Sequence, residues 1–163
     1  NIPKLVARLG GEQLYGQNTT VPLRELLQNG ADAVRARRLL EGRAPEWGAV
    51  TVTLREEGEK TILEVHDTGI GMSADAITTG LLDFGTSYWD SALARQEFPG
   101  LHSKKFWSTG KFGIGFFAVF MAASVVRVIS RQIDDGKSDT RVLEFLDGWM
   151  EGPFSAMPIL ASN

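Results

Sequence analysis

The sequence predicts an α+β fold, in which a mostly antiparallel, mixed sheet carries helices on one face as a two-layer sandwich. Three observations predict it. Alternating apolar and polar residues occur in two pairs of segments, and a short polar turn joins each pair, as in β-hairpins. Helical patterns are inserted between the pairs. The chain has 163 residues, enough for one domain with its own core, so we treat residues 1–163 as a single domain.

The first part of the chain predicts two helices. A weak helix is expected over residues 3–9, ending at Gly10-Gly11. A long helix is expected over residues 21–40. A threonine at position 19 or 20 can cap it, Pro22 suits its first turn, and Gly42 ends it.

The middle of the chain predicts a hairpin and then a less regular stretch. Strands are expected over residues 50–55 and 61–66, around a turn at 57–59. A short helix should follow near residues 74–81. Residues 84–109 combine glycine, serine, proline and scattered aromatic residues, so we expect them to be irregular.

The last part predicts a helix over residues 113–123 and a second hairpin. Its strands are expected over residues 125–132 and 140–145. The polar turn Asp134-Asp135-Gly136 joins them.

The composition of the chain excludes several classes of partner and site. The chain has 17 basic and 20 acidic side chains and a net charge of −3, so nucleic acid is an improbable partner. It has no cysteine and two histidines, which excludes disulfides, cysteine zinc sites and a histidine-rich metal site. No apolar stretch could span a bilayer and no signal-peptide pattern opens the chain, so we expect a cytoplasmic protein. The missing initial methionine predicts a fragment of a longer protein.

The long helix carries an unusual polar stripe. Glu25, Asn29 and Asp32 are spaced i, i+4 and i+7 and share a narrow face. Arg24 and Arg35 lie to one side and should face solvent. Such a stripe is commonly a solvated surface. Alternatively, Asn29 offers its side-chain oxygen to a hard cation, Glu25 acts as a base for water, and Asp32-Ala33 continue the surface towards a ligand.

Two glycine-rich loops favour the second interpretation. Residues 67–72, Asp-Thr-Gly-Ile-Gly-Met, follow a predicted strand. The carboxylate of Asp67 can accept a hydrogen bond from an exocyclic amine, and Gly69 and Gly71 let a flat ligand approach. Residues 110–116, Gly-Lys-Phe-Gly-Ile-Gly-Phe, open a helix whose N–H groups could face an anion. An ordinary Asp turn and close helix packing are the alternatives.

These three segments, in this order, resemble the motifs of the GHKL ATPases. The first motif, E-x-x-x-N-x-x-D-A, stands at residues 25–33, the second, D-x-G-I-G-M, at 67–72, and the third, G-x-F-G-x-G-F, at 110–116. The resemblance covers residues 14–130. It is strongest to the N-terminal ATP-binding domain of the HtpG-like 90-kDa heat-shock chaperones.

The resemblance implies a role for each motif. Glu25 would be the general base that activates water, Asn29 would hold Mg²⁺, and Asp67 would bind the adenine amine. The same resemblance assigns the remaining contacts with ATP or ADP to Asp32, Ala33, Gly69, Gly71, Met72, Lys111, Phe112, Gly113, Ile114, Gly115 and Phe116.

The resemblance also implies a function. The protein would hydrolyse ATP slowly, and residues 84–109, which we call the lid, would close over the nucleotide, hinged at Gly85, Gly100 and Gly110. Closure would drive a conformational change that involves downstream domains of the same chain and a nucleotide-dependent homodimer. The alternative is a nucleotide-sensing module of a regulatory or defence protein. Where the chaperones carry Asn-Asn-Leu-Gly after the second motif, this chain has residues 78–81, Thr-Thr-Gly-Leu, so ribose contacts there stay unassigned.

Overall fold

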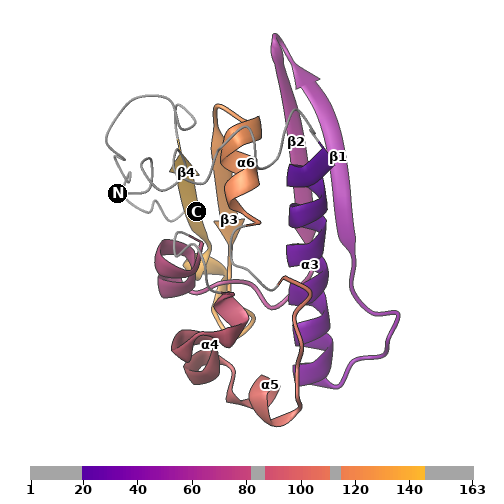
Figure 1. Cartoon of the computed structure of the whole chain (residues 1–163), viewed down its shortest axis with the longest axis vertical. Coiled ribbons are helices and arrows are strands. Elements are labelled where there is room, and N and C mark those ends of the chain that lie inside the picture. Colours follow the sequence, from indigo (N-terminus) through magenta and orange to yellow (C-terminus); the bar gives the residue numbers. More distant parts are fainter. Residues whose placement is uncertain (1–19, 82–86, 111–114, 146–163) are drawn as a thin grey trace.

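Helices and antiparallel strands together form an α+β fold, as predicted (Figure 1). The computed structural model describes residues 20–81, 87–110 and 115–145, and the predicted helix over residues 3–9 lies outside them. In chain order, the described elements are α3 (Thr20–Glu41), β1 (Val50–Glu57), β2 (Lys60–Asp67), η1 (Ala76–Gly80), η2 (Tyr88–Asp90), α4 (Ala92–Glu97), α5 (Pro99–Ser103), α6 (Phe117–Ala122), β3 (Val126–Ser130), η3 (Lys137–Asp139) and β4 (Arg141–Phe145).

The long helix and both hairpins are confirmed. Helix α3 begins and ends within one residue of the predicted bounds. Strands β1 and β2 pair from Val50↔Asp67 to Glu57↔Lys60, and strands β3 and β4 pair antiparallel in the same way. Asp67 therefore ends β2 beside the start of β1, which is where a loop can carry the second glycine motif back to α3.

The expectation of one continuous sheet differs from the described strands, which form two separate two-stranded ladders. Hydrogen bonds link the two ladders just beyond the ends of β2 and β3. There the Ile133 N–H donates to the Ile70 carbonyl at 3.0 Å, and the Met72 N–H donates to Ser130 Oγ at 2.9 Å. The second glycine motif thus lies at the ends of β2 and β3, where hydrogen bonds that joined these two strands into one sheet would begin.

Two apolar clusters give the described residues their core, and α3 contributes to both. Val119, Phe120 and Val126 form one cluster, with Leu26 of α3 packed against it. Ala36 of α3 belongs to the other, which also contains the buried residues Ile70, Phe98 and Leu101. Helix α3 packs against β1, β2, α5 and α6. Its position therefore fixes how the hairpins and the lid approach one another.

The prediction that the lid is irregular was wrong. Residues 88–103 form η2, α4 and α5 (Figure 1). Ser91 caps α4 by accepting the Ala94 N–H at 3.0 Å. Phe98 and Leu101 are 3% and 5% exposed. These helices are too short for a periodic pattern to reveal them, and burial against α3 stabilises them instead.

The helix predicted near residues 74–81 is confirmed, and the start predicted at residue 113 for the next helix lies outside the described residues. The helix expected near residues 74–81 includes a π-helical turn at Ala76–Gly80. The helix expected from residue 113 is described as α6 from Phe117 onward. Within the described residues, no helix combines the length and the apolar character that crossing a bilayer requires.

Candidate functional site

Helix α3 brings the three predicted motifs together. A β-carbon added to Gly115 would stand 2.0 Å from Glu25 Oε2, and one added to Gly110 would stand 3.9 Å from Asn29 Oδ1. One added to Gly69 would stand 2.5 Å from the Ala33 β-carbon. Successive turns of one helix face therefore meet the two glycine motifs, which is the arrangement that the sequence predicted.

The second motif is built closely into the fold. The Ile70 N–H donates to the Ala33 carbonyl at 3.2 Å. Gly71 has a φ of 70°, and a β-carbon there would stand 1.8 Å from the Arg131 carbonyl oxygen. Only glycine fits this position, because it tolerates positive φ and has no β-carbon. The loop therefore has one backbone path, which presents Asp67 and Met72 on either side of its glycines.

The protein holds the Asp67 carboxylate with one hydrogen bond and shifts its pKa. Its Oδ1 accepts the Gly69 N–H at 2.8 Å, which is the one hydrogen bond to this carboxylate among the described residues. The residue as a whole is exposed, yet the protein around the carboxyl removes part of its hydration and raises its pKa above the ordinary value. The Gly69 N–H and His66 oppose that rise. Oδ2 remains available to accept from a ligand.

Glu25 lies in a sheltered position beside the third motif. Its side chain is 17% exposed, and Arg24 Nη2 donates to its Oε1 at 3.1 Å. The other carboxylate oxygen faces Gly115, where the absence of a β-carbon leaves it room. A carboxylate so placed has one oxygen held by a cation and one directed at the glycine loop.

Asn29, one helical turn after Glu25 on α3, offers an exposed carboxamide. One amide oxygen suits Mg²⁺, which keeps most of its water and is completed by substrate phosphates rather than by a protein cage. The described residues contain no group of three or more His, Cys, Asp or Glu side chains able to hold a metal. The chemistry of a single carboxamide oxygen at Asn29 would fit a magnesium ion that enters with a phosphate ligand.

Asp32 is placed differently from Glu25 and Asn29. It is 1% exposed, and its Oδ2 accepts the N–H groups of Thr109 and Gly110 at 2.8 and 3.2 Å. Its Oδ1 accepts a hydrogen bond from Arg35, which also donates to Thr109 Oγ1. Sequence reasoning missed Arg35 and Thr109. The i, i+3 spacing of Asp32 and Arg35 was the signal available for the pair.

The third motif is described only at its two ends. Gly110 lies near Asn29, and Gly115 lies against Glu25. Phe116 packs edge-on against Phe120, with ring centroids 5.4 Å apart. Lys111, Phe112, Gly113 and Ile114 lie outside the described residues, so their roles stay predictions.

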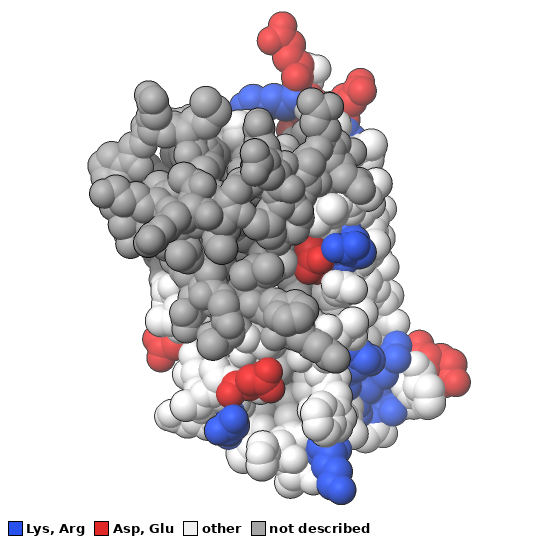
Figure 2. All heavy atoms as spheres, viewed as in Figure 1, with Lys and Arg blue, Asp and Glu red and all other residues white. Residues whose placement is uncertain are grey.

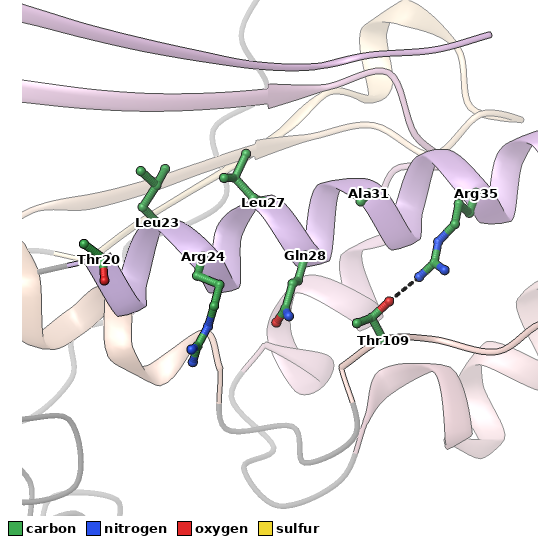
Figure 3. A pocket seen from close by; sticks show the side chains of 8 residues that line it. All are labelled: Thr20, Leu23, Arg24, Leu27, Gln28, Ala31, Arg35 and Thr109. Atoms are coloured by element: carbon green, nitrogen blue, oxygen red, sulfur yellow. Dashed lines mark hydrogen bonds between the residues drawn. The ribbon is translucent and has the colours of Figure 1, made fainter. Parts of the chain in front are cut away.

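An open groove of about 570 Å³ runs along a different face of α3 (Figure 3). Leu27, 36% exposed, contributes apolar surface to it. Arg24 and Arg35 bring positive charge to the same groove, and Thr109 closes one end. Elsewhere on the described surface in Figure 2, basic and acidic side chains lie intermingled. On that face they form no basic stripe of the kind that binds nucleic acid.

Comparison with known proteins identifies the family to which the sequence is similar. The sequence model of the family described as histidine kinase-, DNA gyrase B-, and HSP90-like ATPase matches residues 18–153. The chain is 32% identical over 145 residues to the mitochondrial heat shock protein 75 kDa of Bos taurus, covering 85% of this chain and 19% of that protein. It is 29% identical over 131 residues to an endoplasmin homolog of Caenorhabditis elegans (73% and 16%) and 29% identical over 125 residues to the chaperone protein HtpG of Campylobacter jejuni (74% and 20%). The chain thus spans about a fifth of the length of these relatives.

Proposed function

The chain belongs to the histidine kinase-, DNA gyrase B- and HSP90-like ATPase family, and from that premise we propose that it binds ATP or ADP with Mg²⁺, hydrolyses ATP slowly and couples nucleotide binding to lid closure. The observation that carries the proposal is the meeting of both glycine motifs with one face of α3, at Glu25, Asn29 and Ala33. A nucleotide needs a base pocket and a phosphate site held at a fixed separation, and a single rigid helix that contacts both motifs supplies that separation.

The base would bind at the second motif. Asp67 Oδ2 would accept a hydrogen bond from the exocyclic amine, while Oδ1 stays occupied by the Gly69 N–H. The space that the missing β-carbons of Gly69 and Gly71 leave is occupied by Ala33 and the Arg131 carbonyl, so these glycines would serve the pocket by letting the loop pack tightly, and Met72 would add an apolar wall. Specificity for adenine then follows from the amine donor, because a carboxylate would repel the carbonyl oxygen of a guanine at the same point.

The phosphates would bind between α3 and the third motif. Asn29 would hold Mg²⁺, which when bound neutralises phosphate charge. Glu25 would accept a proton from water as the water oxygen attacks the γ-phosphorus, and ADP would leave with the electrons of the broken P–O bond. Hydrogen bonding to Arg24 orients the Glu25 carboxylate for this role.

The lid makes specific contacts with the rest of the molecule that its movement would break. Ser73, outside the lid, donates its hydroxyl to Glu97 of α4, and within the lid Glu97 also accepts the Tyr88 hydroxyl at 2.5 Å. Burial and the Glu97 carboxylate raise the pKa of Tyr88, so it remains a neutral donor. Ser73 directly follows the second motif. Lid opening would therefore separate Glu97 from the segment that leaves the base pocket.

Calorimetric titration of the protein with ATP and ADP, with and without Mg²⁺, tests the proposal. We expect saturable binding that strengthens with Mg²⁺. Glu25→Gln should retain ATP binding and lose turnover, because Gln keeps the shape but cannot take a proton. Glu144→Gln, an exposed change on β4, serves as the matched control. Absence of binding in the native protein, or full turnover in Glu25→Gln, would contradict the proposal.

The partners and the cellular location of the protein depend on more than the part of the relatives that this chain spans. A role of chaperone type, contacts with downstream domains and a nucleotide-dependent homodimer are included in the proposal on the strength of the HtpG and endoplasmin relatives. A cytoplasmic location stays a prediction, since one relative is mitochondrial by name.

A further inference from the structure

A buried carboxylate holds the start of the third motif. Asp32 is 1% exposed, and one of its oxygens accepts two adjacent backbone N–H groups, those of Thr109 and Gly110. These amides lie 77 and 78 residues away in the sequence. Two N–H donors on one carboxylate oxygen fix both the position and the direction of the backbone at Thr109–Gly110.

Arg35 completes this contact from the solvent side. Its guanidinium donates to the second oxygen of Asp32 and to Thr109 Oγ1 (Figure 3). The Arg35 side chain remains 45% exposed. Arg35, one helical turn from Asp32, therefore neutralises the buried carboxylate. It also bonds Thr109, the residue whose N–H donates to that carboxylate.

We propose that Asp32 and Arg35 act as a positioning pair that fixes Thr109–Gly110 opposite Asn29 and thereby sets the phosphate side of the site. The consequence for ligand binding rests on the proposed function, but the geometry of the pair does not. Gly110 comes close to Asn29 Oδ1, and Asp32 lies one turn further along α3. Losing Arg35 leaves a buried charge with two amide donors and no cation, which favours separation of the loop from α3.

The Asp32–Arg35 pair should affect binding of the phosphates and leave binding of the base unchanged. The second motif makes none of the contacts of this pair: Asp67 pairs with Val50 and accepts the Gly69 N–H, and Ile70 bonds Ala33 and Ile133. Adenosine has the base and no phosphate, whereas ADP has both. A loosened Thr109–Gly110 segment therefore should weaken ADP binding and spare adenosine binding, a difference that general destabilisation would not produce.

Hydrogen exchange of the nucleotide-free protein gives the direct test. In Arg35→Gln, the amides of Thr109 and Gly110 should exchange about tenfold faster, the loss expected when a charge-assisted contact is removed. Thr109→Val keeps the backbone amide and removes only the hydroxyl, so it should give a smaller increase. Arg127→Gln breaks an exposed cross-strand ion pair with Glu144 and is the matched control. Asp32→Asn should give the largest increase if it folds.

The ligand measurement completes the experiment. Arg35→Gln should weaken ADP binding by about tenfold while adenosine binding stays unchanged. Exchange at Thr109 and Gly110 equal to that of the Arg127→Gln control would overturn the inference, as would parallel losses for ADP and adenosine. If the native protein binds no nucleotide, the proposed function fails, and the exchange rates still decide whether the pair holds the loop.

Discussion

The two glycine motifs contact the same helix but are held in place by different means. The second motif is fixed mainly through backbone: Ile70 donates to the Ala33 carbonyl and accepts from the Ile133 N–H, and Gly71 lies against the Arg131 carbonyl, while Arg37 and Ser130 add side-chain hydrogen bonds. At its described ends the third motif meets side chains of α3: Asp32 accepts the Gly110 N–H, and Glu25 lies against Gly115. Backbone contacts depend little on residue identity, whereas side-chain contacts can be removed or altered singly.

This difference teaches how one site can combine rigidity and adjustment. The proposed base pocket, held mainly by main chain, would keep its shape whether or not ligand is present. A phosphate site held by carboxylates can shift when charge enters, because those carboxylates interact with the ligand's charge and with the loop together. Substitutions in the second motif should therefore cost stability, and substitutions in the third should cost activity.

The largest effect is expected from Gly71→Ala. Its β-carbon would collide with a backbone carbonyl, and its φ is positive. We expect a loss of about 3 to 5 kcal/mol in the free energy of unfolding, measured by urea denaturation. Gly58→Ala is the control, because Gly58 also has positive φ but has open space around it, and should cost about 1 kcal/mol. Equal losses in the two variants would show that packing does not constrain the second motif.

Gly115→Ala should lower activity much more than stability, the opposite of Gly71→Ala. The new β-carbon would meet the flexible end of Glu25, so the side chain can swing away at a stability cost of about 1 kcal/mol or less. Displacing the base should lower the ATP turnover rate about 100-fold. Turnover assays alongside thermal denaturation check both halves. A large drop in melting temperature with normal specific activity would break the comparison.

Asp67→Asn should separate binding from stability within the second motif. We expect adenosine and ADP affinity to fall about 10- to 100-fold, because Asn loses the charged acceptor. The raised pKa of Asp67 means that folding favours its protonated form, a contribution fully present below the unfolded value of 3.8 and lost as pH rises through the folded value. The neutral Asn variant should therefore be at least as stable as the native protein at pH 7.

The same pKa predicts the pH dependence of binding. Adenosine affinity should fall as pH drops towards the Asp67 pKa, because the protonated carboxyl donates where the amine also donates. The fall should occur at a higher pH than for an ordinary aspartate. Calorimetry with adenosine avoids titration of phosphate. A flat profile down to pH 4 would contradict the assignment of Asp67.

The smallest effect concerns the chain that leads into the third motif. Lys105 has a φ of 55° and ends α5, where the Phe106 N–H reaches the Leu101 carbonyl and the Lys105 N–H reaches the His102 carbonyl. Glycine is the usual residue in this left-handed position. Lys105→Gly should stabilise the protein by about 0.5 to 1 kcal/mol in urea denaturation. Lys104→Gly, at ordinary φ and with a bond to the Leu39 carbonyl, should destabilise it.

Local sequence pattern was sufficient for α3 and both hairpins. Their apolar residues recur at the period of the element, and polar turns such as residues 57–59 and 134–136 separate the strands. Pattern also placed Glu25, Asn29 and Asp32 on one face of α3 with Ala33 continuing it, and the glycine motifs come close to Glu25, Asn29 and Ala33 of that set. These predictions needed no knowledge of what packs where.

What pattern could not supply depends on segments distant in the chain. The helical wheel puts Asp32 with Glu25 and Asn29, but the burial of Asp32 comes from residues 109–110, far along the sequence. Leu27 has the same apolar side chain as its neighbour Leu26, which packs against the cluster of Val119, Phe120 and Val126, yet it is 36% exposed because none of the described elements covers that side of α3 completely. The lid helices α4 and α5 span six and five residues, too few for periodicity, and form because Phe98 and Leu101 are buried.

The aromatic residues of the lid give the protein an optical reporter of its own. Trp89 contacts Phe106 and Tyr88, with ring centroids 4.9 and 5.3 Å apart, whereas Trp107 is 81% exposed. Fluorescence from Trp107 already reports water and should change little when the lid moves. Trp89 also packs against the cluster that contains Ala36 of α3, so its emission should shift to longer wavelength when the lid leaves α3. Replacing Trp47, Trp107 and Trp149 with Phe would leave Trp89 as the sole tryptophan and let lid motion be followed in real time without an attached dye.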